Sequence, residues 1–259
     1  MASGLAVAGA IALAVALSGC GKSRRAEPAA AATPAEASEA EEHVAGAEGD
    51  PDDIQVSPIA GPAGAGGPAA FLAEATRVLD TMTASSYAHK THIEGTVYDV
   101  DCSGFVDYVL GRTAPTSLGE LRAATVKRPL ARHFVDFLAA LGAARTTWER
   151  IARVQDLTAG SLVAWRKPDD VASTNTGHVM IVAAGPTRHG DGAWSVPIID
   201  ASASPHGHED SRKKSRATGV GRGTMVLETS PSGAPIAYRW SSLHSSHRHA
   251  TEIVMARVR

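Results

Sequence analysis

Asp101-Cys102-Ser103-Gly104-Phe105-Val106 is the stretch that tells most about this chain. The apolar residues from Phe105 to Leu110 recur at helical spacing, so we expect a core-packed helix that begins at or near Cys102. A helix N-terminus carries partial positive charge, which stabilises a thiolate beside it. Because the thiolate is the nucleophilic form of cysteine, this stretch predicts a reactive thiol at the start of a helix.

Helical spacing surrounds this stretch, and strand spacing follows it. Pro68 opens a predicted helix over 68–82, and residues 113–155 are also expected to be helical, with apolar faces over 130–141 and 148–154. Six later segments rich in Val and Ile are predicted strands: 161–165, 178–183, 195–199, 224–227, 236–240 and 253–258. Helices first and strands afterwards predict an α+β fold, with N-terminal helices packed on an antiparallel sheet.

The N-terminal residues have the features of an export signal. The apolar run 5–17 has the length of a signal-peptide core and is short for a membrane-spanning helix. It ends in Leu17-Ser18-Gly19-Cys20, which resembles the lipobox of bacterial lipoproteins, whose cysteine becomes the lipid-modified first residue. We therefore expect a signal peptide over 1–19 and a protein anchored by lipidated Cys20 to the bacterial cell envelope, in the periplasm or on the outer surface. The alternative is an N-terminal membrane anchor that is not cleaved.

Residues 20–67 are predicted to be a disordered, lipid-anchored tether to a catalytic domain over 68–259. The tether is rich in Ala, Glu, Pro and Gly, with almost no large apolar residue before Ile54. Residues 22–53 carry a net charge of −6, which leaves +4 on residues 54–259. This mildly basic domain either suits an anionic partner such as a cell-wall polymer or has an ordinary solvated surface. The charge is too small, without a stripe of basic and aromatic residues, for a nucleic-acid binder.

The two cysteines have separate predicted roles. If Cys20 carries lipid, Cys102 has no partner for an internal disulfide, which is unusual because exported proteins meet oxidising compartments. Such a thiol is either buried and inert or reactive, and its neighbours decide between the two.

A histidine and an aspartate further along the chain are candidates for activating Cys102. His178 begins an apolar strand, and Asp200 ends the strand 196–200, so adjacent antiparallel strands would place the two side chains together. An imidazole within hydrogen-bond reach can take the thiol proton, and a carboxylate can orient the imidazole. Taken singly, His178 is more often a structural residue and Asp200 a turn former.

Four segments in sequence order resemble the NlpC/P60 family of cell-wall cysteine peptidases. They are the nucleophile stretch 101–106, the strand entry 156–165 (DLTAGSLVAW), the histidine strand 177–182 (GHVMIV) and the segment 199–202 (IDAS). The resemblance implies a papain-like α+β fold. It also implies a cysteine peptidase or amidase that hydrolyses peptide bonds of peptidoglycan stem peptides through an acyl-enzyme, without a cofactor or metal.

The same resemblance assigns catalytic roles by position. It makes Cys102 the nucleophile, His178 the general base and then acid, and Asp200 the residue that orients His178. The backbone N–H of Cys102 would help to bind the oxyanion.

Substrate binding is assigned in the same way. The resemblance implies that Asp101, Ser103 and an upstream tyrosine bind the free amine of the stem peptide. Tyr87 is the first candidate for this tyrosine, and Tyr98 is its rival. The partners it implies are the stem peptide and, through the lipid anchor, the membrane; we expect a monomer.

The chain also departs from the family pattern. The family's P-Y-x-W-G-G run before the nucleophile is replaced by Ser86-Tyr87-Ala88-His89-Lys90, which leaves the substrate open. A long insertion precedes Asp156, and residues 203–259 extend beyond the minimal family domain. Two alternatives therefore stay open: a papain-like acyltransferase or amidase acting on a non-wall substrate, and an inactive tethered scaffold that binds wall polymer or a partner hydrolase.

Three other patterns have simpler interpretations. The histidines within 206–208 and 244–249 match no strong zinc spacing and are expected on solvated loops. The glycines of 219–223 lack the strand–loop–helix context of a phosphate loop. The basic loop 212–216 is expected to line the cleft and contact an anionic substrate.

Overall fold

The computed structural model describes residues 55–56, 66–142, 147–167, 175–215, 217–245 and 247–259. The predicted signal peptide, Cys20 and most of the predicted tether lie outside these residues. Among the described residues, no helix has the length and apolar character needed to cross a membrane.

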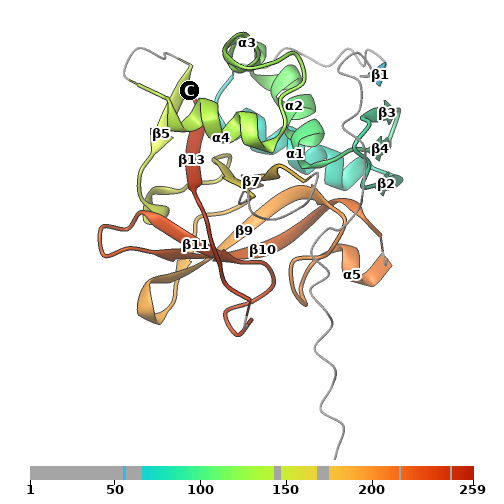
Figure 1. Cartoon of the computed structure of the whole chain (residues 1–259). Coiled ribbons are helices and arrows are strands. Elements are labelled where there is room, and N and C mark those ends of the chain that lie inside the picture. Colours follow the sequence, from blue (N-terminus) through green and yellow to red (C-terminus); the bar gives the residue numbers. More distant parts are fainter. Residues whose placement is uncertain (1–54, 57–65, 143–146, 168–174, 216, 246) are drawn as a thin grey trace, which may run out of the picture. The chain divides into compact units, whose positions relative to one another are not determined.

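The two helices predicted around the cysteine stretch are confirmed. Helix α1 (Pro68–Thr81) has its proline in the first turn, where a missing backbone N–H costs nothing, and it buries Phe71, Ala75 and Val78. Helix α2 (Cys102–Thr113) begins at the cysteine itself. The two helices pack against each other and lie above the large sheet in Figure 1.

The segment 113–155 is helical only in its first part. Helices α3 (Pro115–Ala124) and α4 (Ala131–Ala139) form as expected, and α4 packs on the large sheet through its apolar face. The helical expectation is wrong for residues 148–151, which form strand β5 (Trp148–Ile151), followed by a 3-10 turn (Val154–Asp156). Trp148 and Ile151 are buried in two different clusters because the strand has apolar contacts on both faces, and this imitates a helical spacing.

A small sheet, for which the sequence pattern predicts no strand, precedes α2. Its strands lie in the order β1 (Gln55–Val56), β3 (His92–Glu94), β4 (Val97–Asp99) and β2 (Ala84–Ser86). Strands of two or three residues are too short to give a periodic signal. The turn between β3 and β4 contains Gly95 at φ 59°, a backbone conformation that glycine adopts without a steric penalty.

The second half of the chain forms a nine-stranded sheet, which confirms the predicted antiparallel strands. Along the sheet the strands follow the order β12-β11-β10-β9-β7-β6-β13-β5, and β8 pairs with β9. The strands not yet located are β6 (Leu162–Arg166), β7 (Gly177–Val182), β8 (Thr187–Arg188), β9 (Ala193–Ser202), β10 (Gly219–Thr229), β11 (Pro235–Arg239), β12 (His249–Ala250) and β13 (Ile253–Val258). All pairings within this sheet are antiparallel.

The large sheet is strongly curled and has two buried faces. Trp165 on β6 stacks on Tyr238 of β11 at 4.2 Å between ring centroids, although three strands separate β6 from β11 in the sheet. We call the concave side the inner face; its core includes Val163, Trp165, Met180, Val182 and Ile198. The opposite side, the helix face, packs against α1, α2 and α4 through residues that include Leu162, Ala164, Val179, Ile181, Ile199 and Ala201. Both faces of β7 are therefore buried, which explains its unbroken apolar sequence.

Candidate active site

Cys102 occupies the first position of α2, with Asp101 as the N-cap. Asp101 Oδ1 accepts hydrogen bonds from the Gly104 backbone N–H at 2.6 Å and from Ser103 Oγ at 2.9 Å. This cap fixes the first turn of the helix, so the thiol lies where the helix dipole favours a negative charge. Cys102 is 5% exposed, so little of its side chain is open to solvent or to a substrate.

The Asp101 carboxylate is neutralised from within the protein. Its Oδ2 lies 3.0 Å from the Arg128 guanidinium and 3.8 Å from His89 Nδ1, and Arg128 also donates to the His89 carbonyl oxygen. Burial raises the pKa of Asp101, but the His89 contact, the Arg128 charge and the Gly104 N–H outweigh it and leave the pKa below its ordinary value. Asp101 is thus an ionised structural cap whose charge already has a counter-ion.

His178 and Asp200 meet as the sequence predicted. His178 Nε2 lies 2.6 Å from Asp200 Oδ2, and the two side chains are 3% and 0% exposed. They lie on the neighbouring strands β7 and β9, on the inner face of the sheet, because each alternates with a residue of the helix face. The rings of Trp165 and Trp240 lie at 5.2 Å from the His178 ring and restrict its rotation.

The ionisation of Asp200 decides which nitrogen of His178 carries the proton. Burial raises the pKa of Asp200, but Arg212 and the imidazoles of His206 and His178 outweigh it and hold the pKa well below its ordinary value. An ionised carboxylate only accepts hydrogen bonds, so His178 Nε2 must donate. In the neutral ring, Nδ1 then carries a lone pair. This Nδ1 is buried and has no hydrogen-bond partner among the described residues.

Cys102 begins the helix that packs on the helix face of these two strands, whereas His178 and Asp200 project from the inner face. Helix α2 packs against β7 and β9, and Cys102 belongs to the same buried cluster as Val179 and Ala201. These two residues directly follow His178 and Asp200 along their strands. The three predicted catalytic residues therefore come from three elements in mutual contact. The His178–Asp200 pair is formed on the inner face, and Cys102 belongs to the helix on the other face.

Three residues of the segment after β9 complete the surroundings of Asp200, and the sequence interpretation missed all of them. His206 Nε2 lies 2.6 Å from Asp200 Oδ2, and Arg212 Nη2 lies 2.9 Å from Asp200 Oδ1. Asp210 accepts from the His206 N–H at 2.8 Å and binds Arg212 at 2.7 Å. All four residues are buried.

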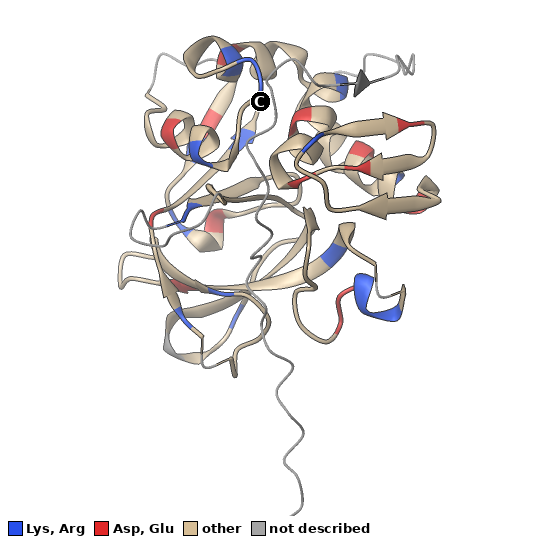
Figure 2. Ribbon diagram, turned by 45° about the vertical axis from the view of Figure 1, so that its right-hand side comes forward, with Lys and Arg blue, Asp and Glu red and all other residues tan. Residues whose placement is uncertain are grey.

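Two expectations are therefore wrong. His206 is not on a solvated loop, since it is 1% exposed. Arg212 does not face a substrate, because two buried carboxylates hold it inside; burial lowers its pKa, but these carboxylates raise it above the ordinary value. Lys213 and Lys214 of helix α5 (Arg212–Ser215) are exposed, and Arg216 lies outside the described residues. The basic helix α5 is blue in Figure 2.

The glycines of β10 explain how this cluster fits. Gly221 pairs with Asp200 in the sheet, and a Cβ at Gly221 would lie 2.6 Å from Arg212 Nε and 2.8 Å from its Cγ. A Cβ at Gly223 would lie 2.5 Å from Asp210 Oδ2. Alternate glycines in a strand mark a close approach by other groups, and this was the signal by which the cluster could have been found.

We expect Gly221→Ala to destabilise the protein by about 1–3 kcal/mol, because the pinned Arg212 side chain cannot move aside without breaking its ion pairs. The measurement is the free energy of unfolding in denaturant. Gly119→Ala is the matched control: Gly119 is exposed on α3 with no atom within 4 Å of the added Cβ, so this change should stabilise by up to about 1 kcal/mol. Equal stability of the two variants would show that Arg212 is not fixed as described.

His178, Asp200 and His206 could also hold a metal ion. They offer three ligand atoms that lie within 4.8 Å of one another. Two zinc ligands at bond lengths of about 2.1 Å in a tetrahedron lie roughly 3.4 Å apart, whereas both Nε2–Oδ2 separations are 2.6 Å. These separations, and the Arg212 charge on the same carboxylate, fit hydrogen bonds better than metal coordination.

The two tyrosines proposed for substrate binding lie in different environments. Tyr98 is fully buried, edge-on to Tyr108 with ring centroids 5.7 Å apart, and is part of the core. Tyr87 is half-buried and lies edge-on to His89, which contacts Asp101. Of the two, Tyr87 is the one placed near the start of α2.

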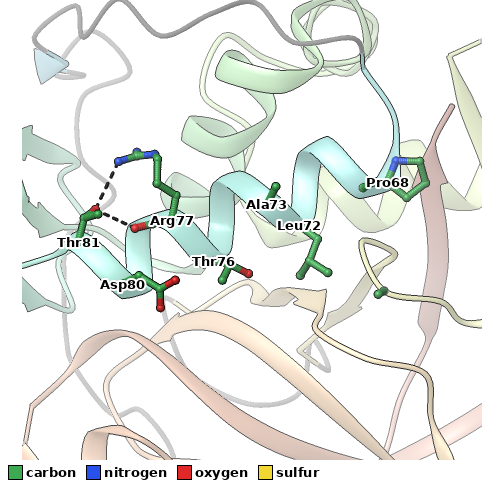
Figure 3. Close-up of a pocket in the computed structure, with 9 residues that line it drawn as sticks. Pro68, Leu72, Ala73, Thr76, Arg77, Asp80 and Thr81 are labelled. Atoms are coloured by element: carbon green, nitrogen blue, oxygen red, sulfur yellow. Dashed lines mark hydrogen bonds between the residues drawn. The ribbon is translucent and has the colours of Figure 1, made fainter.

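A surface groove of about 860 Å³ runs along α1, and it contains none of the candidate catalytic residues. Figure 3 shows Leu72, Thr76 and Asp80 along it, with Thr81 hydrogen-bonded to Arg77 at its end. The groove is mostly apolar, and nothing in the structure shows what covers it.

Comparison with known proteins finds no matching family model, no matching curated protein and no matching solved structure.

Proposed function

We propose that this protein is a cysteine hydrolase in which Cys102 is the nucleophile, His178 the general base and then acid, and Asp200 the residue that orients His178. One observation carries the proposal. His178 is held through Nε2 by an ionised carboxylate, and its buried Nδ1 has no hydrogen bond among the described residues. The helix that begins at Cys102 packs on the other face of the same strand. We also propose that the fold is papain-like, since it combines a cysteine helix with a curled antiparallel sheet.

The proposed reaction proceeds in two halves. His178 Nδ1 takes the thiol proton, and the Cys102 thiolate attacks the carbonyl carbon of an amide. His178 then gives this proton to the nitrogen of the leaving amine as the C–N bond breaks, which leaves a thioester. Water attacks the thioester, with His178 taking its proton, and the C–S bond breaks to release the acid and return the thiolate. The backbone N–H of Cys102, at the start of α2, would help to stabilise the oxyanion.

Peptidoglycan stem peptide is the substrate that the sequence motifs favour, and it is consistent with the proposed location of the protein at the bacterial envelope. The neutralised Asp101 bears on how such a substrate would bind. A carboxylate that already has Arg128 as its counter-ion gains little by binding a substrate amine. We therefore propose that Asp101 and Ser103 stabilise the start of α2, and that Tyr87 is the remaining substrate-binding candidate.

The test is digestion of a purified cell-wall preparation by the full chain, with the products identified by mass spectrometry. We expect stem-peptide fragments, released equally well with excess chelator present. Hydrolysis of small amides or esters without wall fragments would instead favour an amidase or acyltransferase with another substrate. If a chelator abolished activity and one added metal ion restored it, His178, Asp200 and His206 would instead be interpreted as a metal site. No hydrolysis of any substrate, with wall binding retained, would favour a scaffold.

A further inference from the structure

The segment after β9 encloses Asp200 more completely than a simple orienting residue requires. Asp200 Oδ2 accepts hydrogen bonds from Nε2 of His178 and Nε2 of His206, each at 2.6 Å, and Oδ1 accepts one from Arg212 Nη2 at 2.9 Å. His206 and Arg212 both come from residues 203–259, the part of the chain that extends beyond the minimal family domain. This extension therefore supplies most of the groups around the carboxylate.

We propose that His206 is a positioning residue that shares Asp200 with His178 and, together with Arg212, locks the carboxylate in the orientation that His178 requires. The inference rests on the proposed function, in which His178 is the base. A carboxylate held by one imidazole can rotate about its Cβ–Cγ bond. A carboxylate held at both oxygens by three donors cannot rotate without breaking buried hydrogen bonds.

The His206 ring is itself fixed in place. It packs on Trp240 with ring centroids 3.9 Å apart, and the Trp240 indole N–H donates to the Pro205 carbonyl oxygen at 3.2 Å. The His206 backbone N–H is held by Asp210 at 2.8 Å. His206 Nε2 must carry hydrogen, because Asp200 is ionised and only accepts. The other ring nitrogen, Nδ1, lies 3.3 Å from the Trp240 carbonyl oxygen. Burial lowers the pKa of His206 below its ordinary value, although the Asp200 carboxylate opposes this.

The charged groups around His178 determine how removal of His206 acts. Asp200 on β9 and His206 after it contact His178 directly; Arg212 and Asp210 lie one contact further, and Cys102 begins the helix over β7. Trp165 and Trp240 supply uncharged walls. Without the His206 donor, the Asp200 carboxylate becomes a stronger acceptor and favours the protonated form of His178 more. The His178 ring should then lose its proton at a higher pH.

The experiment compares His206→Asn with His206→Gln in the full chain. The asparagine amide is too short to reach Asp200, whereas the glutamine amide can replace the Nε2–H donor. For His206→Asn we expect kcat to fall about tenfold to a hundredfold at unchanged KM, with the alkaline limb of the kcat/KM profile moved to higher pH. In His206→Gln, kcat and the position of the alkaline limb should both lie closer to the wild-type values. His189→Asn is the control, because His189 binds Ser195 on the same sheet and no contact joins it to Asp200 among the described residues.

A readout that needs no turnover separates this inference from the proposed function. Nitrogen NMR of labelled His178 should show hydrogen on Nε2, and a titration midpoint that rises in His206→Asn. If the protein hydrolyses nothing but this midpoint still moves, the proposed function is wrong and the shared carboxylate stands. If hydrolysis is present and neither the alkaline limb nor the His178 midpoint responds to His206→Asn, then His206 only fills space and the inference is overturned.

Discussion

Cys102→Ala is expected to lower hydrolysis by at least about 10⁴-fold and to leave the fold intact. No other described residue in this site offers a thiol, so the covalent route is lost and only binding and charge stabilisation remain. The side chain is small, and its truncation should cost only about 1 kcal/mol of stability. The measurement is kcat/KM on the fragment-releasing substrate, with the thermal midpoint recorded on the same samples.

Cys20→Ser is the matched control, because it removes the only other cysteine of the chain, in the predicted lipobox. The purified Cys20→Ser protein should retain full activity, since no chemical role is proposed for that residue beyond lipid attachment. Wild-type rates in the Cys102→Ala protein would remove Cys102 from the mechanism.

Asp200→Asn is expected to have the second large effect, on activity and on stability together. An amide in place of the carboxylate cannot accept from both imidazoles and Arg212, and it leaves the Arg212 charge with only Asp210 to balance it. Breaking a buried ion pair from one side costs about 3–5 kcal/mol. Loss of the ring orientation and tautomer of His178 should lower kcat by about 10⁴-fold. Denaturant unfolding and steady-state kinetics measure the two effects separately.

The pH dependence of stability gives Asp200→Asn a specific signature. The pKa of Asp200 in the folded protein lies well below its unfolded value of about 3.9. Its contribution to stability is therefore fully present above about pH 4 and is lost as the pH falls through the folded pKa. The wild type should lose stability in acid more steeply than Asp200→Asn, and the two curves should converge at low pH.

Asp156→Asn is the control for a carboxylate–guanidinium pair without burial. Asp156 lies 2.7 Å from Arg153, and both side chains are about half exposed, so solvent screens the pair and no measurable loss is expected. If Asp200→Asn proved as harmless as Asp156→Asn, the buried network around Asp200 would be incorrect.

The predictable features of this protein are those written in local sequence patterns. The helix that begins at Cys102 follows from its apolar spacing, and Gly104 in its first turn has a structural cause, because a Cβ there would collide with the Thr91 hydroxyl. The meeting of His178 and Asp200 was predictable from two adjacent antiparallel strands of alternating side chains.

The features that escaped prediction depend on contacts between distant segments. Strand β5 resembled a helix because it buries Trp148 on one face and Ile151 on the other, which depends on the curl of the sheet. His206 and Arg212 looked like loop residues because a buried polar residue is recognisable only through its partners. Their partner Asp200 is recognisable from its place at the end of a strand, whereas the glycines of β10 that make room for them resemble a phosphate loop in sequence.

Activation of Cys102 by His178 can be measured by titrating the Cys102 thiolate through its ultraviolet absorbance. The Cys20→Ser protein has Cys102 as its single cysteine, and its Cys102→Ser derivative supplies the baseline. We expect the thiolate to form well below the ordinary midpoint of about pH 8.5 for a free cysteine, and His178→Gln to raise the midpoint. A Cys102 thiol that titrates at or above that ordinary midpoint, with no response to His178→Gln, would contradict this activation.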